Sequence, residues 1–211
     1  MFAKKPGNHA AASVVAGLII TVLAAGGSSQ AAAQQAGAPA RDARLRNGFH
    51  FSIGLGSASV SASCAECNTG FFDNRLNGLS GNIQLGGAAT SRLVIAAEFS
   101  GWVKNDEPIY RRIAALDLVV LGYPSETAGF FIKGGVGGLR AIAENDFTRV
   151  QTDAWTAQTG LGYDVAVGGV MLTPYVNYVR TFNAATYFNG VVSPVVVLPN
   201  AIQFGTALTI H

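Results

Sequence analysis

Hydrophobic and polar residues alternate with a period of two over most of the chain from Gly48 onward. The last eleven residues, 201–211, show it most clearly, with Ile202, Phe204 and Leu208 on one face. A period of two predicts a β-strand with one apolar face. About 9–11 such residues cross the hydrocarbon core of a bilayer when the strand is tilted. A final strand of this kind favours a closed sheet, because pairing it with the first strand leaves no unpaired edge.

Seven further segments alternate in the same way. The predicted strands span 48–60, 79–86, 92–103, 110–122, 129–142, 155–167, 171–182 and 201–211. The connections after the first, third, fifth and seventh strands are long or polar, and the other three are short. This asymmetry is typical of outer-membrane barrels, which have short periplasmic turns and longer extracellular loops. The sequence therefore predicts an all-β fold over 48–211, a closed eight-stranded antiparallel up-and-down transmembrane β-barrel with both termini in the periplasm.

Charged strand residues fall on the face opposite the apolar one, and the clearest are Glu98, Asp117, Lys133 and Asp164. A soluble barrel of the lipocalin type would instead bury its apolar face and show the charges to water. Here the apolar face is almost free of charge, and the other face combines charges with glycine and alanine, which favours lipid outside. We expect the four residues to form a lumen charge network in which Lys133 pairs with a carboxylate, because an unpaired buried charge is costly.

The N-terminal segment has the features of a secretory signal peptide. Lys4 and Lys5 precede the apolar run 10–25, and an Ala-x-Ala site ends near Ala33. A retained membrane anchor would need nearer 18 to 20 unbroken apolar residues. We expect a signal peptide over 1–33, a flexible periplasmic linker over 34–47, and export to the outer membrane.

Composition excludes several classes of function. Only 12% of the 211 residues are charged, the formal net charge is +2, and no stripe of lysine and arginine suggests a nucleic-acid surface. The glycine-rich run 134–138 precedes no helical pattern, so it is not expected to bind nucleotide phosphates. These glycines are expected to relieve crowding in a narrow lumen. The sequence indicates no cofactor and no metal site.

Cys64 and Cys67 are the only cysteines and lie in a polar loop. A thioredoxin-type redox site would need the pair at a helix start, and a structural zinc would need about four ligands. In an exported chain the better interpretation is a local disulfide.

Two alternatives to a structural or surface-interaction role remain open. The first is a lipid-modifying enzyme, since His50 and Ser52 share the inner face of the first strand. They are expected near the periplasmic end, away from the outer leaflet, and no orienting carboxylate can be assigned, so no catalytic residue is predicted. The second is a narrow pore for very small solutes, although eight strands leave room only for side chains.

Three arginines suggest contacts with lipopolysaccharide. Parity turns Arg112, Arg140 and Arg180 outward near the extracellular edge of the apolar band. Arginine is tolerated at this level of a membrane, and its guanidinium suits phosphate. The alternative, that the three are ordinary rim residues in water, stays open. The same level should carry an aromatic belt, for which Tyr110, Trp155 and Tyr178 have the parity.

Several segments also resemble a known family. They are Cys64-Ala-Glu-Cys67, Gly78-Leu-Ser-Gly81, Gly86-Gly87, Gly129-Phe-Phe-Ile-Lys-Gly134, Gly160-Leu-Gly-Tyr163, Thr173-Pro-Tyr-Val-Asn-Tyr178 and Gln203-Phe-Gly-Thr-Ala-Leu-Thr-Ile-His211. From about Gly48 to the end, the chain resembles the small outer-membrane protein β-barrel domain family of Gram-negative bacteria. Such proteins commonly end in an aromatic residue that the barrel-assembly machinery recognises, whereas this chain ends in His211.

The resemblance implies the fold and the outer-membrane location more than any activity. The expected partners are outer-membrane lipid, lipopolysaccharide and, during biogenesis, the barrel-assembly machinery. Surface interactions would use the predicted loops 61–78, 143–153 and 183–200, and the sequence identifies no surface partner.

Overall fold

The computed structural model describes residues 46, 48–63 and 75–211. Eight long antiparallel strands make up this part: β1 (Phe49–Ser63), β2 (Leu76–Thr90), β3 (Leu93–Asp106), β4 (Ile109–Gly122), β5 (Phe130–Glu144), β6 (Arg149–Tyr163), β8 (Val170–Phe188) and β10 (Leu198–Ile210). Two short strands, β7 (Val165–Val167) and β9 (Val191–Val192), pair with β8. In these ranges no helix is long and apolar enough to cross a bilayer.

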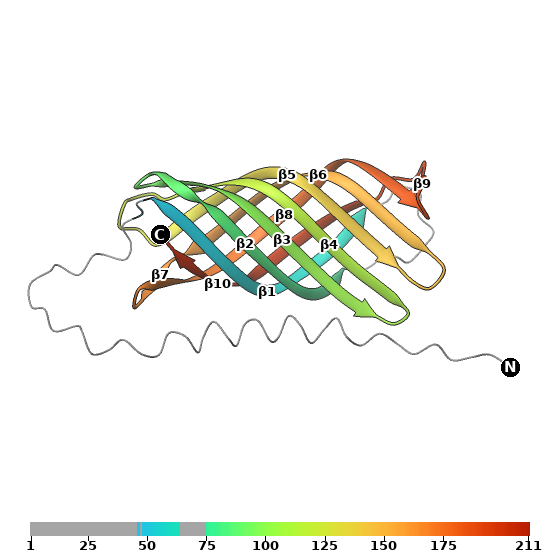
Figure 1. Ribbon diagram of the computed structural model, residues 1–211, viewed down its shortest axis with the longest axis horizontal. Helices are drawn as coiled ribbons and strands as arrows, with labels where there is room; N and C mark the ends of the chain where they lie inside the picture. Colours follow the sequence, from blue (N-terminus) through green and yellow to red (C-terminus); the bar gives the residue numbers. More distant parts are fainter. Residues whose placement is uncertain (1–45, 47, 64–74) are drawn as a thin grey trace, which may run out of the picture. The chain divides into compact units, whose positions relative to one another are not determined.

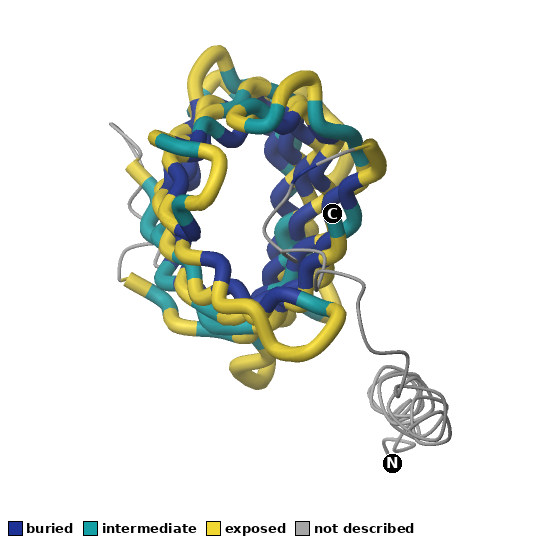
Figure 2. Tube along the Cα trace, turned by 90° about the vertical axis from the view of Figure 1, so that its left-hand side faces the viewer, coloured by how far each residue is buried: buried dark blue, intermediate teal, exposed yellow. Residues whose placement is uncertain are grey.

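The sheet closes on itself. Each long strand pairs with the next along the chain, and β10 pairs with both β8 and β1, so that Phe51 lies opposite Ile210. The strands wind around a common axis (Figure 1), and the view along that axis shows a complete ring (Figure 2). The predicted fold, a closed eight-stranded antiparallel barrel, is confirmed.

The two faces of the strands differ sharply in exposure. Large apolar side chains on the outer face are exposed, as for Leu116 at 62%, whereas the intervening inner residues are buried, as for Asp117 at 2%. The same alternation runs through the strands around the ring (Figure 2). The barrel is therefore apolar outside and buries its charges inside, which is the reverse of a soluble barrel that packs its apolar face inward.

Two predicted polar connections are wrong in extent. Residues 104–109 and 143–153 were expected to be polar connections, but β3 and β4 pair up to Asp106 and Ile109, and β5 and β6 pair up to Glu144 and Arg149. A strand of 15 residues tilted by about 40° rises about 38 Å, which exceeds an apolar band of about 25 Å. Beyond that band polar side chains can continue the ladder, because pairing still satisfies the backbone groups.

The third long loop is also more regular than predicted. In the range 183–200, β8 continues to Phe188, β9 folds back onto it, and β10 begins at Leu198. At the opposite end the connections span 91–92, 123–129 and 164–169, and β6 ends at Tyr163, before Asp164, rather than continuing to Val167. The tip of the first predicted loop, with Cys64 and Cys67, lies outside the described residues.

The lumen is filled by side chains. Inward-facing residues form apolar clusters toward both ends, one around Val119 and Phe131 and another around Val60 and Trp102. Inward glycines sit where a larger residue would collide, since a Cβ on Gly162 would meet the Phe131 ring. Apolar side chains thus share the lumen with the charged and small residues expected there, because a narrow lumen also needs apolar volume to close.

Candidate functional site

A buried ion pair lies in the lumen between strands that are not neighbours. Lys133 on β5 places its Nζ 2.9 Å from Oε2 and 3.1 Å from Oε1 of Glu98 on β3, and both side chains are almost fully buried. Gln84 on β2 donates from its amide nitrogen to Glu98 Oε2. The carboxylate therefore has one charged and one neutral donor, which a buried ion requires to offset its lost hydration.

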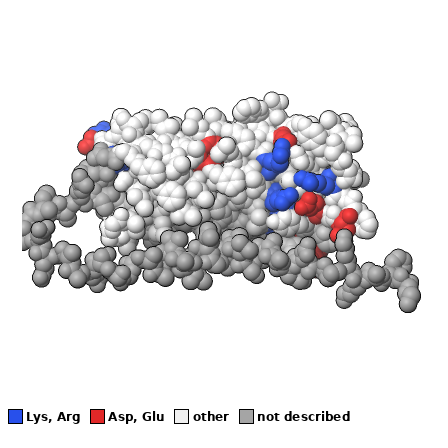
Figure 3. Space-filling view, viewed as in Figure 1, with Lys and Arg blue, Asp and Glu red and all other residues white. Residues whose placement is uncertain are grey.

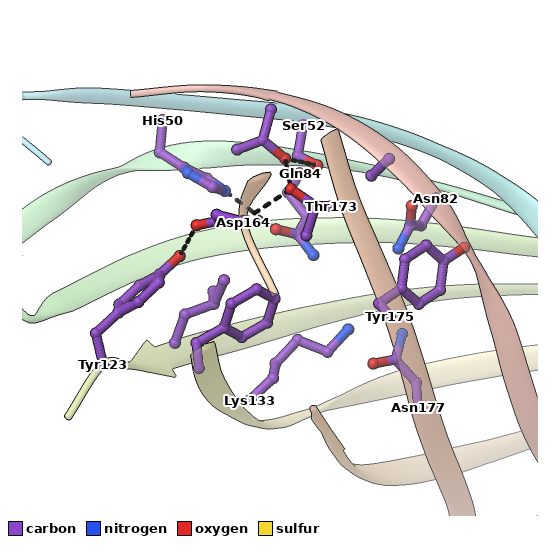
Figure 4. A pocket seen from close by; sticks show the side chains of 14 residues that line it. His50, Ser52, Asn82, Gln84, Tyr123, Lys133, Asp164, Thr173, Tyr175 and Asn177 are labelled. Atoms are coloured by element: carbon purple, nitrogen blue, oxygen red, sulfur yellow. Dashed lines mark hydrogen bonds between the residues drawn. The ribbon is translucent and has the colours of Figure 1, made fainter. Parts of the chain in front are cut away.

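The hydrogen-bonded chain continues from Gln84 toward the end of the barrel. The Gln84 carbonyl oxygen lies 3.1 Å from Nε2 of His50, and Nδ1 of His50 lies 3.3 Å from Nδ1 of His211. His211 Nε2 then lies 3.4 Å from Oδ2 of Asp164. Figure 4 shows His50 and Gln84 from β1 and β2 converging with Asp164 on one lumen cavity.

The glutamine amide sets the direction of one bond in this chain. Since the Gln84 amide nitrogen faces a carboxylate, its oxygen faces His50, and that oxygen accepts the hydrogen bond from His50 Nε2.

Asp164 is the acceptor on which this end of the lumen converges. It accepts hydrogen bonds from Thr173 at 2.7 Å and from the Tyr123 hydroxyl at 3.0 Å, in addition to the contact with His211. Burial by itself raises the pKa of the Asp164 carboxyl, but the hydrogen bonds from His211, Thr173 and Tyr123 outweigh it and hold that pKa below its ordinary value. Burial, followed by the nearby Asp164 charge, raises the pKa of the Tyr123 hydroxyl.

Arg46 seals the same end of the barrel. Its guanidinium lies 3.2 Å from the centroid of the Tyr123 ring, donates to the carbonyl of Ala128 at 2.7 Å, and lies 3.5 Å from Asp164 Oδ2. Although it belongs to the predicted linker, Arg46 is only 1% exposed. The arginine is thus stacked, hydrogen-bonded and charge-compensated, the arrangement in which a buried guanidinium is tolerated.

Sequence reasoning missed three residues of this cluster, Arg46, Tyr123 and His211. The period of two offered a signal for two of them: Tyr123 continues the inward series 119 and 121, and His211 continues 207 and 209. Arg46 precedes the first strand, and no periodic pattern reaches it.

The predicted lumen charges occupy different surroundings. Lys133 and Glu98 form the pair described above, and Asp164 belongs to the cluster at the barrel end. Asp117 lies opposite Glu98 in the register of β3 and β4, accepts a hydrogen bond from Thr156, and keeps its other carboxylate oxygen without a partner in the described ranges. Hydrogen bonds among the described residues thus connect Lys133 and Glu98 to Asp164 through Gln84, His50 and His211, whereas Asp117 lies outside this chain.

No catalytic pair joins His50 to Ser52. The Ser52 hydroxyl bonds the Thr209 hydroxyl at 2.9 Å, and His50 uses its two nitrogens for Gln84 and His211. The neighbouring cavity holds about 20 Å³, which is room for about one water molecule. Within residues 46, 48–63 and 75–211 no group of three or more histidine, cysteine or acidic residues could hold a metal ion.

Charged residues gather at the other end of the barrel. Figure 3 shows basic and acidic side chains together over the end that carries the β3–β4 and β5–β6 hairpins. Arg112 lies 3.7 Å from Glu144, and Arg140 lies 2.6 Å from Asp153, its partner in the register of β5 and β6.

The side chains predicted to form the extracellular edge of the belt are exposed on the outer face. They are Arg112, Arg140, Arg180, Tyr110, Trp155 and Tyr178. Cross-strand acids thus already neutralise two of the three arginines predicted to contact lipopolysaccharide.

No family model and no curated protein matches the sequence. Among solved structures, Neisserial surface protein A is 14% identical over 76% of this chain and 96% of its own, with a TM-score of 0.50. The attachment invasion locus protein Ail of Yersinia pestis, solved with the heparin analogue sucrose octasulfate, is 11% identical over 77% of this chain and 99% of its own, also with a TM-score of 0.50. The chain therefore has the fold of small outer-membrane β-barrels, in agreement with the family resemblance.

Proposed function

We propose that this chain is an integral outer-membrane β-barrel protein with a structural or surface-interaction role and a closed lumen. One observation carries the proposal: an exposed apolar belt encircles strands whose inner faces bury ion pairs and amides. The belt consists of Phe49, Ile53, Leu55, Leu79, Ile83, Leu85, Phe99, Leu116, Leu118, Ile132, Val136, Leu161, Val176, Phe204, Leu208 and Ile210. An apolar surface that surrounds the molecule is far larger than the patches of a few hundred Å² found on soluble monomers, and lipid would cover it.

The closed lumen follows from burial along its length. Trp102, Thr152, Gln158 and Asn177 face inward at different levels, and each is 6% exposed or less. Side chains lining a water-filled pore would be accessible, as they are in barrels of 16 or more strands. We therefore expect no stable conductance from the refolded protein in planar bilayers, and unitary conductance of porin size would overturn this part of the proposal.

The orientation of the barrel in the membrane is inferred from the difference between its two ends. The start of β1 and His211 lie at the end sealed by Arg46, and the hairpins that extend beyond the apolar band with their charged residues lie at the other. Since the extracellular side of such barrels extends farther than the periplasmic side, we place the Arg46 end in the periplasm and the charged hairpins outside the cell. A signal peptide over 1–33 would provide export, and the barrel-assembly machinery would provide insertion.

The role itself is best described as structural or surface-interactive. The lumen cavity holds little more than one water, and the histidine and serine weighed as catalytic residues are bonded to other partners. The accessible chemistry lies at the outer surface, in the charged hairpins and the belt beside them. Lipid and lipopolysaccharide are the partners that such a surface would meet.

Cell fractionation combined with gel migration before and after boiling tests the proposal. We expect the protein in the outer-membrane fraction, migrating differently when unboiled because the barrel stays folded in the detergent of the gel. Recovery in the soluble periplasmic fraction, or identical migration in both samples, would overturn it.

A further inference from the structure

The outer face of β1 changes character along its length. Its outward residues are apolar at Ile53 and Leu55, but serines occupy the outward positions 57, 59 and 61. In the register of the sheet, Ser59 lies opposite Ile202 of β10, which in turn lies opposite Tyr178 of β8. The apolar belt thus stops at this seam, toward the end that carries the charged hairpins.

A notch is recessed into the outer surface here. It holds about 100 Å³ and is lined chiefly by Ser59, Ser61, Arg75, Tyr178 and Asn200. The volume is several times what one water requires and is enough for a phosphate group. Its lining combines a guanidinium, three hydroxyl groups and an amide, which are the side chains that bind phosphate oxygens.

The hydroxyl of Ser59 has no partner in the described part of the chain although it is buried. Its neighbour Ser57 donates to the carbonyl of Gly78 at 3.0 Å, so serines on this face can be satisfied by the protein. A buried hydroxyl without a partner costs free energy, which an oxygen-bearing ligand in the notch would offset.

The arginines at the notch differ from the other outer arginines in their ion pairing. Arg112, Arg140 and Arg149 each lie within 4 Å of a carboxylate oxygen of Glu144 or Asp153. Among the described residues, neither Arg75 nor Arg180, which lies two positions beyond Tyr178 on the same face, is found in an ion pair. Within the described residues, therefore, no carboxylate cancels the field at the notch, whereas the field at the hairpins is largely cancelled.

We infer that this notch binds the phosphorylated headgroup of an outer-leaflet lipid, with Arg75 and Ser59 as principal contacts and Arg180 at its flank. The exposed belt begins next to the notch at Phe204, two positions along β10 from its lining residue Ile202, so the acyl chains of the same lipid can lie along the barrel wall. That continuity favours a lipid over a free anion. The inference rests on the proposed outer-membrane location.

Native mass spectrometry on the full chain, refolded in a neutral detergent, tests the inference. The probes are diphosphorylated lipid A, the same lipid without phosphates, and inorganic phosphate as a competitor. We expect the intact lipid to bind and the dephosphorylated lipid to bind at least tenfold more weakly. The double variant Arg75→Gln/Ser59→Ala should lose at least tenfold in affinity, Arg180→Gln should lose less, and Arg75→Lys should retain part of the binding.

Arg149→Gln is the matched control, because it removes a cation from the same end of the barrel outside the notch. It should change the affinity less than twofold. A loss equal to that of the double variant, equal binding of the dephosphorylated lipid, or displacement of the lipid by millimolar inorganic phosphate would each overturn the inference. Gel migration of every unboiled variant reports barrel folding separately, so a failed notch and a failed barrel are distinguishable.

Discussion

Replacing Lys133 by methionine removes one charge from the lumen while keeping a side chain of similar length. Glu98 is then left almost fully buried, with only the Gln84 amide as a donor. Replacing Glu98 by glutamine leaves the Lys133 ammonium buried instead. The double variant Lys133→Met/Glu98→Gln contains neither charge.

The magnitude follows from the geometry of the pair. At 2.9 Å the attraction is about 6 kcal/mol for an effective dielectric constant of about 20, and desolvation of the two ions offsets much of it. Breaking a buried pair from one side typically costs about 3–5 kcal/mol, because the remaining charge has no partner. We expect each single variant to lose about 3 kcal/mol or more and the double variant to lose no more than either, which gives a coupling energy of about 3 kcal/mol.

Urea unfolding of the refolded barrel measures these values, with tryptophan fluorescence and unboiled gel migration followed together under conditions where folding and unfolding curves coincide. Losses that simply add in the double variant would refute the reasoning, since they would mean that the two charges do not interact. Single variants as stable as the parent protein would refute it as well.

Three further predictions concern the barrel end, the lumen packing and the first loop. Because the pKa of Asp164 is lowered in the folded state, its contribution to the free energy of unfolding is present above about pH 4 and is lost as the pH falls below that value. Asp164→Asn should therefore make urea resistance depend less on pH between about pH 5 and pH 3. Gly162→Ala should cost about 1–3 kcal/mol in the same unfolding assay, because its methyl group would meet the buried ring that faces it from β5, whereas outward Gly134→Ala, with open space around it, should be close to neutral. Mass measurement after alkylation without reductant should find Cys64 and Cys67 unlabelled, and two labels would exclude the disulfide.

Strand positions and faces could be predicted from the sequence because both depend on a local period of two. For example, Glu98 and Asp117 point into the lumen, as predicted from their positions between the outward apolar residues of their strands. Strand ends were less predictable. Charged residues such as Glu144 and Arg149 look like a loop in the sequence, but they pair across two strands that have left the apolar band.

The partners inside the lumen could not be predicted for a different reason. Lys133 reaches Glu98 past the intervening strand β4, and such a contact depends on the tilt and shear of the closed barrel. Likewise, Arg46, Tyr123 and Asp164 meet only because three connecting segments converge at one end. Neither strand parity nor sequence spacing contains that information.

The two tryptophans of the chain test the central claim most directly, because they lie on opposite faces of the wall. Trp155 points outward and is 58% exposed, whereas Trp102 is 2% exposed in the lumen and donates to the carbonyl of Ala58 at 3.1 Å. Trp102→Phe and Trp155→Phe each leave a single fluorophore, and vesicles of brominated lipid quench a tryptophan that touches acyl chains. The account predicts strong quenching of Trp155 and little of Trp102. Quenching of Trp102 with Trp155 unaffected, in variants that still migrate as folded barrels, would contradict it.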